Sequence, residues 1–294
     1  MCRYRLSFTK AVMAFLEYNL TVNDEQFNEF RGKHTVSHRT ISGRNWSYIV
    51  AGSGSRAVVI LPGAGAFEEL GAEVMFQVVS ALEKHARVIS IGYPPGAQTV
   101  RAILEGIKTV LDSMGIPTAV LVGHSLGGLF SACFVQAFPE MVDSVVIANF
   151  AIPSKRRSRR FRILLPALIH LPNRLIVSAC KWQMRGFLKG HQAGFWISKL
   201  QSRETNRTLR HMSSHYRCML DFLENWHISR KSVTNWNGRA LIMESSDEQL
   251  FSSEEREALR RLFRNTTVRV IQKAGHLSWI TRPQEFEEAI TEFL

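Results

Sequence analysis

The segment that decides the fold is Thr118-Ala-Val-Leu-Val-Gly-His-Ser-Leu-Gly-Gly-Leu129. Its first half is a β-branched apolar run, which predicts a fully buried strand. Its second half leads into an apolar helical pattern that stops before Pro139. A strand and a helix joined by the pattern G-x-S-x-G predict a sharp, strained turn with Ser125 at its apex. The close backbone approach needs small residues, which are present as Gly123, Gly127 and Gly128.

Short apolar runs alternate with helical patterns on both sides of this segment. We expect buried strands at 57–61, 87–91, 143–148, 240–243 and 268–271, and helices at 69–85, 99–114, 253–263 and 283–294. Two earlier strands, 34–41 and 45–51, should be antiparallel. The alternation predicts right-handed βαβ units, and hence an α/β fold with a mostly parallel, doubly wound sheet.

Positive charge is concentrated in one part of the chain. The net charge is +12, from 37 Lys and Arg against 25 Asp and Glu. Residues 151–236 hold 17 basic and three acidic residues, a net of +14, which leaves −2 for the rest. This segment is also helical and aromatic in pattern. We therefore predict an N-terminal extension (1–33), a core domain (34–150 and 237–294) and an inserted, basic helical cap (151–236).

The cysteines indicate neither a disulfide framework nor a metal site. Cys2, Cys133, Cys180 and Cys218 form no C-x-x-C pair, which favours a reducing compartment such as the cytoplasm. No apolar run approaches the roughly 18 residues of a membrane span. The apolar run near the N-terminus is too short for a signal peptide, so we expect a frayed extension, with an organelle-targeting segment or an amphipathic anchor as alternatives.

Three regions resemble the α/β-hydrolase family. They are Gly123-His-Ser-Leu-Gly-Gly128, Leu241-Ile-Met-Glu-Ser-Ser-Asp-Glu-Gln-Leu-Phe251 and Ala274-Gly-His-Leu-Ser278, within a resemblance that covers roughly 35–150 and 238–294. A serine nucleophile needs a base to take its proton and a third group to hold that base. The resemblance implies an α/β-hydrolase fold, Ser125 as nucleophile and His276 as general base and then acid.

For the acid, the resemblance implies Asp247, which would fix the imidazole tautomer. We align Asp247 with the family pattern, a small residue-x-x-acid just past the strand, and Glu248 is the alternative. Asn149 occupies the other position at which relatives carry the acid. We reject it because an amide cannot stabilise an imidazolium as a carboxylate does.

The resemblance also implies an oxyanion hole built from two backbone N–H groups. One belongs to Leu126, and the matching donor in the loop Pro62-Gly-Ala-Gly65 is Ala64. Pro62 stands where the family usually has histidine. A purely structural glycine-rich turn is the alternative. A phosphate-binding loop is disfavoured, because no third glycine and no Gly-Lys-Ser follow.

Other histidines have simpler explanations. His124 adjoins the serine, and since adjacent side chains point in different directions we expect it to pack or to bond a loop. His211 and His215 stand four apart on a predicted helix, but no third ligand is nearby. We predict no metal and no cofactor.

The basic run Lys155-Arg-Arg-Ser-Arg-Arg-Phe-Arg162 has three interpretations. They are a solvated helix face, a contact with an anionic membrane surface, and a contact with nucleic acid. The last is disfavoured because no recognition module is present. The aromatic residues of the segment either line an apolar pocket or pack its helices: Phe161, Trp182, Phe187, Phe195, Trp196, Phe222 and Trp226.

These features predict a carboxylesterase-like or lipase-like serine hydrolase, cleaving esters or thioesters of small, moderately apolar substrates through an acyl-enzyme. Acyl transfer, perhydrolysis and carbon–carbon hydrolysis use the same groups and stay open. Epoxide hydrolase and dehalogenase chemistry is disfavoured, because those relatives have Asp where this chain has Ser125. The rival hypothesis is a non-catalytic adaptor, since Tyr93-Pro94 and Ser125-Leu-Gly-Gly128 are similar to maspardin-type members.

Overall fold

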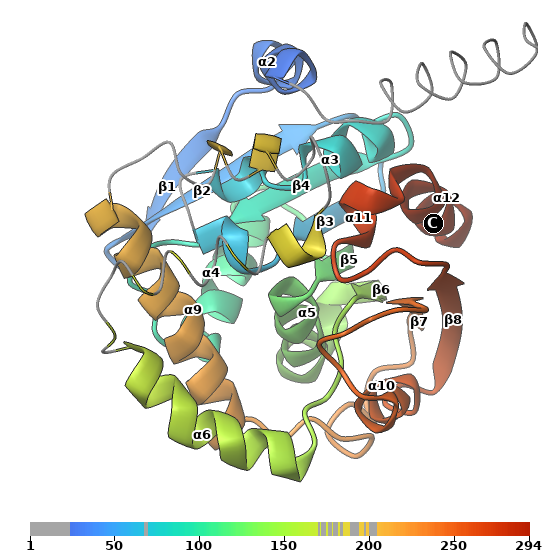
Figure 1. The fold of residues 1–294 in the computed structure, drawn as a ribbon. Helices are drawn as coiled ribbons and strands as arrows, with labels where there is room; N and C mark the ends of the chain where they lie inside the picture. Colours follow the sequence, from blue (N-terminus) through green and yellow to red (C-terminus); the bar gives the residue numbers. More distant parts are fainter. Residues whose placement is uncertain are drawn as a thin grey trace, which may run out of the picture.

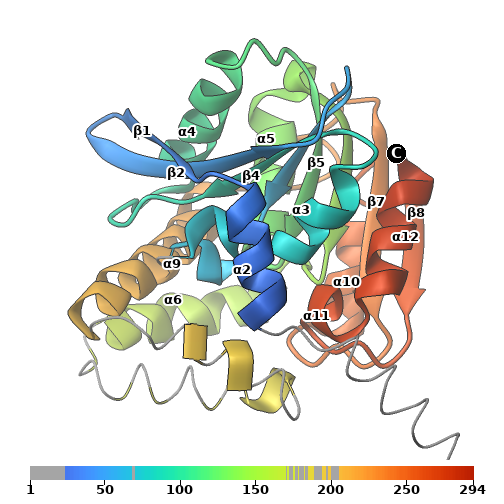
Figure 2. The same cartoon turned by 90° about the horizontal axis from the view of Figure 1, so that it is seen from above.

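A computed structural model describes residues 24–67, 70–169 and 205–294, together with single residues and short stretches between 171 and 199. One eight-stranded sheet runs through the molecule, with helices on both faces (Figures 1 and 2). The spatial order of its strands is β1-β2-β4-β3-β5-β6-β7-β8. Their bounds are β1 Ser37–Ile41, β2 Arg44–Ala51, β3 Ala57–Leu61, β4 Arg87–Gly92, β5 Ala119–His124, β6 Val142–Ala148, β7 Arg239–Ser245 and β8 Asn265–Ile271.

The pairing confirms the predicted α/β fold with a mostly parallel sheet. β1 pairs with β2, and β2 with β4, in antiparallel fashion, whereas all pairs from β4 to β8 are parallel. β3 occupies the predicted residues. β8 begins three residues before the predicted start, at Asn265, because this edge strand is mostly exposed and its polar first half gives no apolar signal.

The helices predicted at 69–85, 99–114, 253–263 and 283–294 are present in that order, and each is shorter than predicted. The bounds of the described helices are α2 Asp24–Lys33, α3 Phe76–Leu82, α4 Val100–Asp112, α5 Leu126–Ala137, α6 Lys155–Ile169, α9 Thr205–Asn225, α10 Ser253–Arg260, α11 Ser278–Thr281 and α12 Pro283–Phe293, with 3-10 turns η1 Ala64–Phe67, η2 Gly71–Glu73 and η3 Pro139–Met141. The helix predicted from residue 69 becomes regular only at Phe76, after η2.

A separate apolar core fills each face of the sheet. All residues of β3 are buried, and alternate ones serve opposite faces. Val59 and Leu61 belong to the core that includes α4 and α5. Val58 and Ile60 belong to the core that includes α2, α3 and α12. A strand buried on both faces explains why β3 is an uninterrupted apolar run.

The last ten residues of the predicted N-terminal extension, 24–33, pack against the core. These residues form α2, whose Phe27 and Phe30 are buried and whose rings lie 5.2 and 5.5 Å from the ring of Phe76. Arg31 adds a two-pronged ion pair with Glu73, at 2.6 and 2.7 Å. α2 is therefore part of the second core. Residues 1–23, on which the targeting and anchor alternatives rest, lie outside the described part of the chain.

The described part of the inserted segment contains α6 and α9, which lie alongside each other at the outside of the molecule (Figure 1). The bounds of the cap stay a prediction. Cys133 and Cys218 are buried free thiols, as expected for a reduced protein. Within the described ranges, no helix has the length and hydropathy needed to cross a lipid bilayer.

The packing of α4 against β2 generates a prediction about Gly106. A Cβ at Gly106 would lie 1.8 Å from the Trp46 ring, which is itself buried. Alanine is intrinsically better than glycine in a helix by about 1 kcal/mol. Overpacking against Trp46 should outweigh this gain, so Gly106→Ala should destabilise the protein by about 1–3 kcal/mol in urea unfolding.

Gly32 provides the matched control, because it also lies in a helix and its Cβ would meet nothing within 4 Å. Gly32→Ala should stabilise the protein by up to about 1 kcal/mol. A Gly106→Ala protein as stable as the Gly32→Ala protein would contradict the described contact with Trp46.

Candidate active site

The predicted sharp turn is present between β5 and α5. Ser125 has φ = 53° and ψ = −116°, a conformation that side-chain-bearing residues rarely adopt. A Cβ on Gly127 would lie 1.8 Å from the carbonyl oxygen of Leu61, and one on Gly123 would lie 2.4 Å from that of Gly127. The glycines are therefore required by backbone contact. The Ser125 N–H donates to the Ala148 carbonyl oxygen at 2.9 Å, which ties the turn to β6.

Ser125 and His276 meet at the carboxyl edge of the sheet, although 151 residues separate them in sequence. The Ser125 Oγ lies 2.9 Å from the His276 Nε2. On the other side of the imidazole, the Nδ1 lies 3.0 Å from the Oε2 of Glu248. The side chains of His276 and Glu248 are only 6% and 2% exposed. We refer to Ser125, His276 and Glu248 as the Ser-His-Glu array.

The predicted acid is corrected: Glu248, and not Asp247, contacts the imidazole. The Asp247 Oδ1 instead accepts hydrogen bonds from the Ser245 hydroxyl at 2.5 Å and from the Gly275 N–H at 2.8 Å. After β7 the chain makes a turn in which the Glu248 N–H donates to the Ser245 carbonyl oxygen. This turn aims position 248 at His276, whereas Asp247 braces the backbone of the histidine loop.

The environment of Glu248 favours the carboxylate form. Burial opposes ionisation, but hydrogen bonds outweigh it and hold the pKa of Glu248 at about 2. The hydrogen bond and charge of His276 contribute most, followed by the Leu250 N–H at 2.9 Å and the Asn149 Nδ2 at 3.0 Å. Glu248 is thus an acceptor that can fix the tautomer of His276 and stabilise its protonated form.

Asn149 contacts the Ser-His-Glu array, which the sequence analysis did not predict. Its side chain is buried, and its Nδ2 donates both to Glu248 and to the Gly275 carbonyl oxygen, the latter at 3.1 Å. Its Oδ1 accepts from the Ser278 hydroxyl at 2.5 Å. Asn149 therefore links the acid to both sides of His276. The sequence does offer one signal, a polar residue directly after a buried strand, but we considered position 149 only as a place for the triad acid.

His124 bonds a loop, as expected from its position before the serine. It is buried, and its Nε2 donates to the His276 carbonyl oxygen at 2.9 Å. Burial, with the nearby imidazole of His276, lowers the pKa of His124 to about 3. His124 is therefore neutral at physiological pH and supports the backbone of His276.

The loop after β3 lies against the serine. A Cβ on Gly63 would be 3.4 Å from the Ser125 Cβ. The buried Tyr93 holds this loop, because its hydroxyl donates to the Pro62 carbonyl oxygen at 2.9 Å and its N–H donates to the Ala66 carbonyl oxygen at 2.9 Å.

Both predicted oxyanion donors lie on segments next to Ser125. Ala64 begins η1 within the loop held by Tyr93, and Leu126 is the first residue of α5. The first N–H groups of a helix have no acceptor within that helix, so they are available to an anion. Their use as an oxyanion hole stays a prediction.

Aromatic rings surround the imidazole. The rings of Phe187 and Phe251 lie 5.2 and 6.1 Å from that of His276. Phe187 comes from the inserted segment and Phe251 from the loop that follows Glu248. These side chains make the surroundings of the Ser-His-Glu array apolar on the side of the insertion.

Glu255 joins the inserted segment to α10. Its buried carboxylate accepts from the Ser154 N–H at 2.9 Å and from the Arg157 Nε at 2.7 Å. It also forms the N-terminal cap of α10 reciprocally with Ser252. Burial raises the pKa of Glu255, but these hydrogen bonds, of which that from Arg157 is the strongest, outweigh burial and hold the pKa at about 2.

The histidine pair considered as metal ligands does not form a described site. His215 stacks on Tyr216, with ring centroids 5.0 Å apart, whereas the side chain of His211 lies outside the described residues. Across the described ranges, no group of three or more His, Cys, Asp or Glu side chains is arranged to hold a metal ion.

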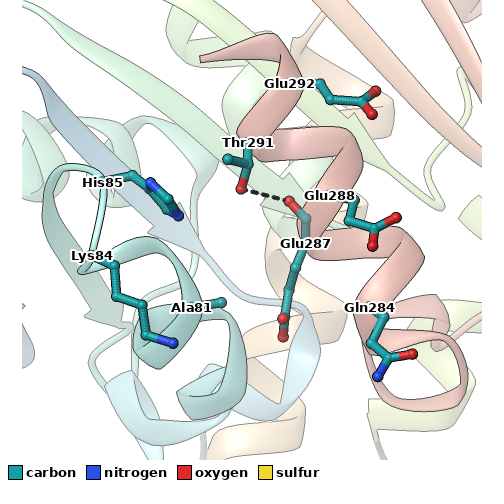
Figure 3. Close-up of a pocket in the computed structure, with 8 residues that line it drawn as sticks. All are labelled: Ala81, Lys84, His85, Gln284, Glu287, Glu288, Thr291 and Glu292. Atoms are coloured by element: carbon teal, nitrogen blue, oxygen red, sulfur yellow. Dashed lines mark hydrogen bonds between the residues drawn. The ribbon is translucent and has the colours of Figure 1, made fainter.

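A separate surface pocket of about 360 Å³ lies between α3 and α12 (Figure 3). Its lining contains no member of the Ser-His-Glu array; it consists of Ala81, Lys84, His85, Gln284, Glu287, Glu288, Thr291 and Glu292. Burial, with the nearby charge of Glu288, raises the pKa of Glu287 to about 7, although Lys84 acts in the opposite direction.

A serine, a histidine and a carboxylate lie together at the carboxyl ends of parallel strands, an arrangement typical of alpha/beta hydrolases. The sequence model of the alpha/beta hydrolase family matches residues 58–289. The chain belongs to this family and is an alpha/beta hydrolase.

Individual relatives are distant. The chain is 24% identical to RutD of Pseudomonas savastanoi pv. phaseolicola, a protein named as a proposed carbamate hydrolase, over 68% of this chain and 76% of that protein. It is 27% identical to human epoxide hydrolase 4, over 42% of this chain and 36% of that protein. The crystal structure of a hydrolase from Pseudomonas aeruginosa superposes with a TM-score of 0.70 at 17% identity, covering 88% of this chain and 98% of that one. At this identity, the structural likeness shows the fold alone.

The low pKa of Glu248 generates a prediction about acid stability. The unfolded chain takes up a proton near the ordinary value of 4.5, whereas the folded protein keeps the carboxylate down to about 2. Wild type should therefore lose stability as the pH falls through this window, with a slope of up to about 1.4 kcal/mol per pH unit from this group. Glu248→Gln should lack this part of the slope in urea unfolding. Identical pH slopes for wild type and Glu248→Gln would contradict the described environment of Glu248. A Glu248→Gln protein that is less stable by the same amount at every pH has the wild-type slope and would also contradict it, whereas lower stability with a shallower slope would not.

Glu287 should act in the opposite direction. Its pKa is about 7 in the folded protein and 4.5 ordinarily, so the folded state retains a proton that the unfolded state loses between these values. Stability should fall as the pH rises through this window, and Glu287→Gln should remove that loss. Between about pH 5 and pH 8, the Tm of Glu287→Gln should rise relative to wild type. Glu288→Gln, at an exposed neighbour, controls for removing one carboxylate; an equal response there would contradict the assignment to Glu287.

Proposed function

We propose that the chain is a serine hydrolase that cleaves carboxylic esters or thioesters of small, moderately apolar substrates. The observation that supports this most directly is the Ser-His-Glu array, with its distances of 2.9 and 3.0 Å. Both contacts are within hydrogen-bonding distance without any rearrangement of side chains. The array is also held in a defined geometry, because Ser125 has a fixed turn conformation and the side chains of His276 and Glu248 are buried.

In the proposed acylation step, the Ser125 Oγ attacks the carbonyl carbon while its proton moves to the His276 Nε2. Negative charge then develops on the carbonyl oxygen, where the N–H groups of Ala64 and Leu126 would stabilise it. Collapse of this tetrahedral species breaks the bond to the leaving alcohol or thiol. The leaving group takes the proton from His276, and an ester between Ser125 and the acyl group remains.

Deacylation repeats the same steps with water as nucleophile. His276 takes a proton from the water as it attacks the acyl carbon, and then returns a proton to the Ser125 Oγ as the carboxylic acid leaves. In both halves Glu248 accepts the Nδ1 hydrogen bond and balances the positive charge of the imidazolium. Asn149 and His124 act as positioning residues, because they contact Glu248 and the His276 backbone rather than the reacting atoms.

The choice of substrate class rests on the nucleophile and on the surrounding rings. A serine nucleophile suits acyl carbon, and Phe187 and Phe251 beside His276 favour an apolar substrate group. A carbamate, the substrate class in the name of the RutD relative, also contains a carbonyl carbon and is within reach of the same mechanism. The likeness to epoxide hydrolase 4 carries less weight, because the resemblance assigns an aspartate nucleophile to epoxide hydrolases.

A fluorophosphonate probe tests the proposal by forming a covalent bond with an activated serine. Wild type should gain the mass of one adduct on Ser125, located by peptide mass spectrometry. Ser125→Ala and His276→Ala should show no labelling. Glu248→Gln should label on the order of 10³- to 10⁴-fold more slowly, as expected when the group orienting the histidine is lost.

Asp247→Asn is the matched control, because Asp247 is adjacent in sequence yet braces Gly275 instead of touching the imidazole. It should label within about tenfold of wild type, so the two variants rank the two acids directly. Absence of labelling in folded wild type, checked by circular dichroism, would instead favour the non-catalytic adaptor hypothesis. Labelling that survives Ser125→Ala would contradict the proposed nucleophile.

A further inference from the structure

α6 combines an inner face fixed to the protein with an outer face that lacks described partners. On the inner side, Arg157 pairs with Glu255, Arg162 donates to the Leu223 carbonyl oxygen and Leu165 is buried. Figure 1 shows the helix at the outside of the molecule, alongside α9. The helix is thus firmly attached, and its outer face is directed away from the sheet.

The outer face is basic in its first half and apolar in its second. Lys155, Arg156, Arg159 and Arg160 are exposed, and within the described ranges no acidic side chain pairs with any of them. One turn later, Ile163 and Leu164 are 74% and 47% exposed. Positions 156, 159, 160 and 163 follow the i, i+3, i+4, i+7 spacing of a single helix face. We call Arg156, Arg159, Arg160, Ile163 and Leu164 the α6 outer face.

Exposed apolar side chains cluster in this part of the chain. Of the eight large hydrophobic side chains found exposed among the described residues, five lie between residues 163 and 182. They include Trp182, which is 79% exposed. An isolated exposed hydrophobic residue needs no explanation, but a concentration of them beside unpaired cations does.

We infer that the α6 outer face docks on an anionic lipid bilayer, with its arginines on the lipid headgroups and Ile163 and Leu164 inserted at the acyl boundary. Basic residues next to bulky apolar ones are the pattern of a helix that lies in the membrane interface. A second copy of the chain is a poorer occupant, because two such basic faces repel each other. Nucleic acid would satisfy the arginines but leaves Ile163 and Leu164 exposed to water.

Co-sedimentation with vesicles tests the inference without using the proposed catalytic activity. The protein should bind vesicles of phosphatidylcholine containing about one-third phosphatidylglycerol, and should bind pure phosphatidylcholine vesicles much less well. Raising the salt from about 0.05 M to about 0.5 M should weaken binding strongly, since it shortens the range of the electrostatic attraction.

Two variants separate the parts of the α6 outer face. Arg156→Gln/Arg159→Gln/Arg160→Gln should weaken binding to the anionic vesicles by roughly tenfold or more, because each cation near the surface contributes. Ile163→Gln/Leu164→Gln keeps every charge and good helix propensity, and should also weaken binding, by roughly tenfold. Arg157 is left unchanged because of its pair with Glu255.

Matched controls remove the same groups elsewhere. Arg39→Gln/Arg56→Gln/Arg264→Gln removes three exposed arginines outside the inserted segment, and Val268→Thr/Val270→Thr alters two exposed apolar residues of β8. Both controls should bind vesicles as wild type does. Thermal unfolding confirms that each variant is folded.

Three outcomes would overturn the inference. Folded wild type could fail to bind anionic vesicles, or the charge control could lose as much binding as the α6 triple variant. In the third outcome, Ile163→Gln/Leu164→Gln binds vesicles as wild type does. In the same outcome, the α6 triple variant loses binding both to vesicles and to a single-stranded oligonucleotide. That result would identify a general polyanion surface instead of a membrane surface.

Discussion

One backbone contact organises the catalytic edge of this molecule. The start of α5 approaches the end of β3 so closely that no side chain fits between Gly127 and the carbonyl oxygen of Leu61. Because of this contact, the serine turn and the loop after β3 lie side by side, so the segments that carry Ala64 and Leu126 both adjoin Ser125. The strain at Ser125 is tolerated because the flanking strands and helix are buried on both sides.

The remaining groups reach the same place through the parallel arrangement of the sheet. β5, β6, β7 and β8 are consecutive neighbours, and each is followed by a residue of the site. Ser125 follows β5, Asn149 follows β6, Glu248 follows β7 and His276 follows β8. Residues far apart in sequence therefore become adjacent because the carboxyl ends of parallel strands meet at one edge. Asn149 then holds the loops after β7 and β8 together.

The buried strands and the turn at Ser125 could be predicted because their signals are local, whereas His276 was implied by the resemblance to the family. An apolar run of β-branched residues identifies a strand, and a serine between glycines identifies a sharp turn. The choice between Asp247 and Glu248 is different, since it depends on how the turn after β7 directs two adjacent side chains. Spacing from the strand cannot supply that direction, and both residues are acids.

α2 and Asn149 were missed for a related reason. α2 has only Phe27 and Phe30 as large apolar residues in a polar sequence, too few for a recognisable periodic pattern. Both rings pack against Phe76, which is distant in sequence, and no local pattern links Phe76 to α2. The role of Asn149 likewise arises from three partners distant in sequence. Tertiary contacts of this kind carry no signature in the residues themselves.

The bonds of Glu255 have a mechanical consequence for the inserted segment. A single buried carboxylate holds the first turn of α6 and the first turn of α10 at once. Separating this pair leaves the buried Glu255 carboxylate without its charged partner, so a tilt of α6 is resisted unless α10 moves with it. Since the loop entering α10 also carries Glu248, which contacts the imidazole of His276, a movement of α6 is coupled to the Ser-His-Glu array.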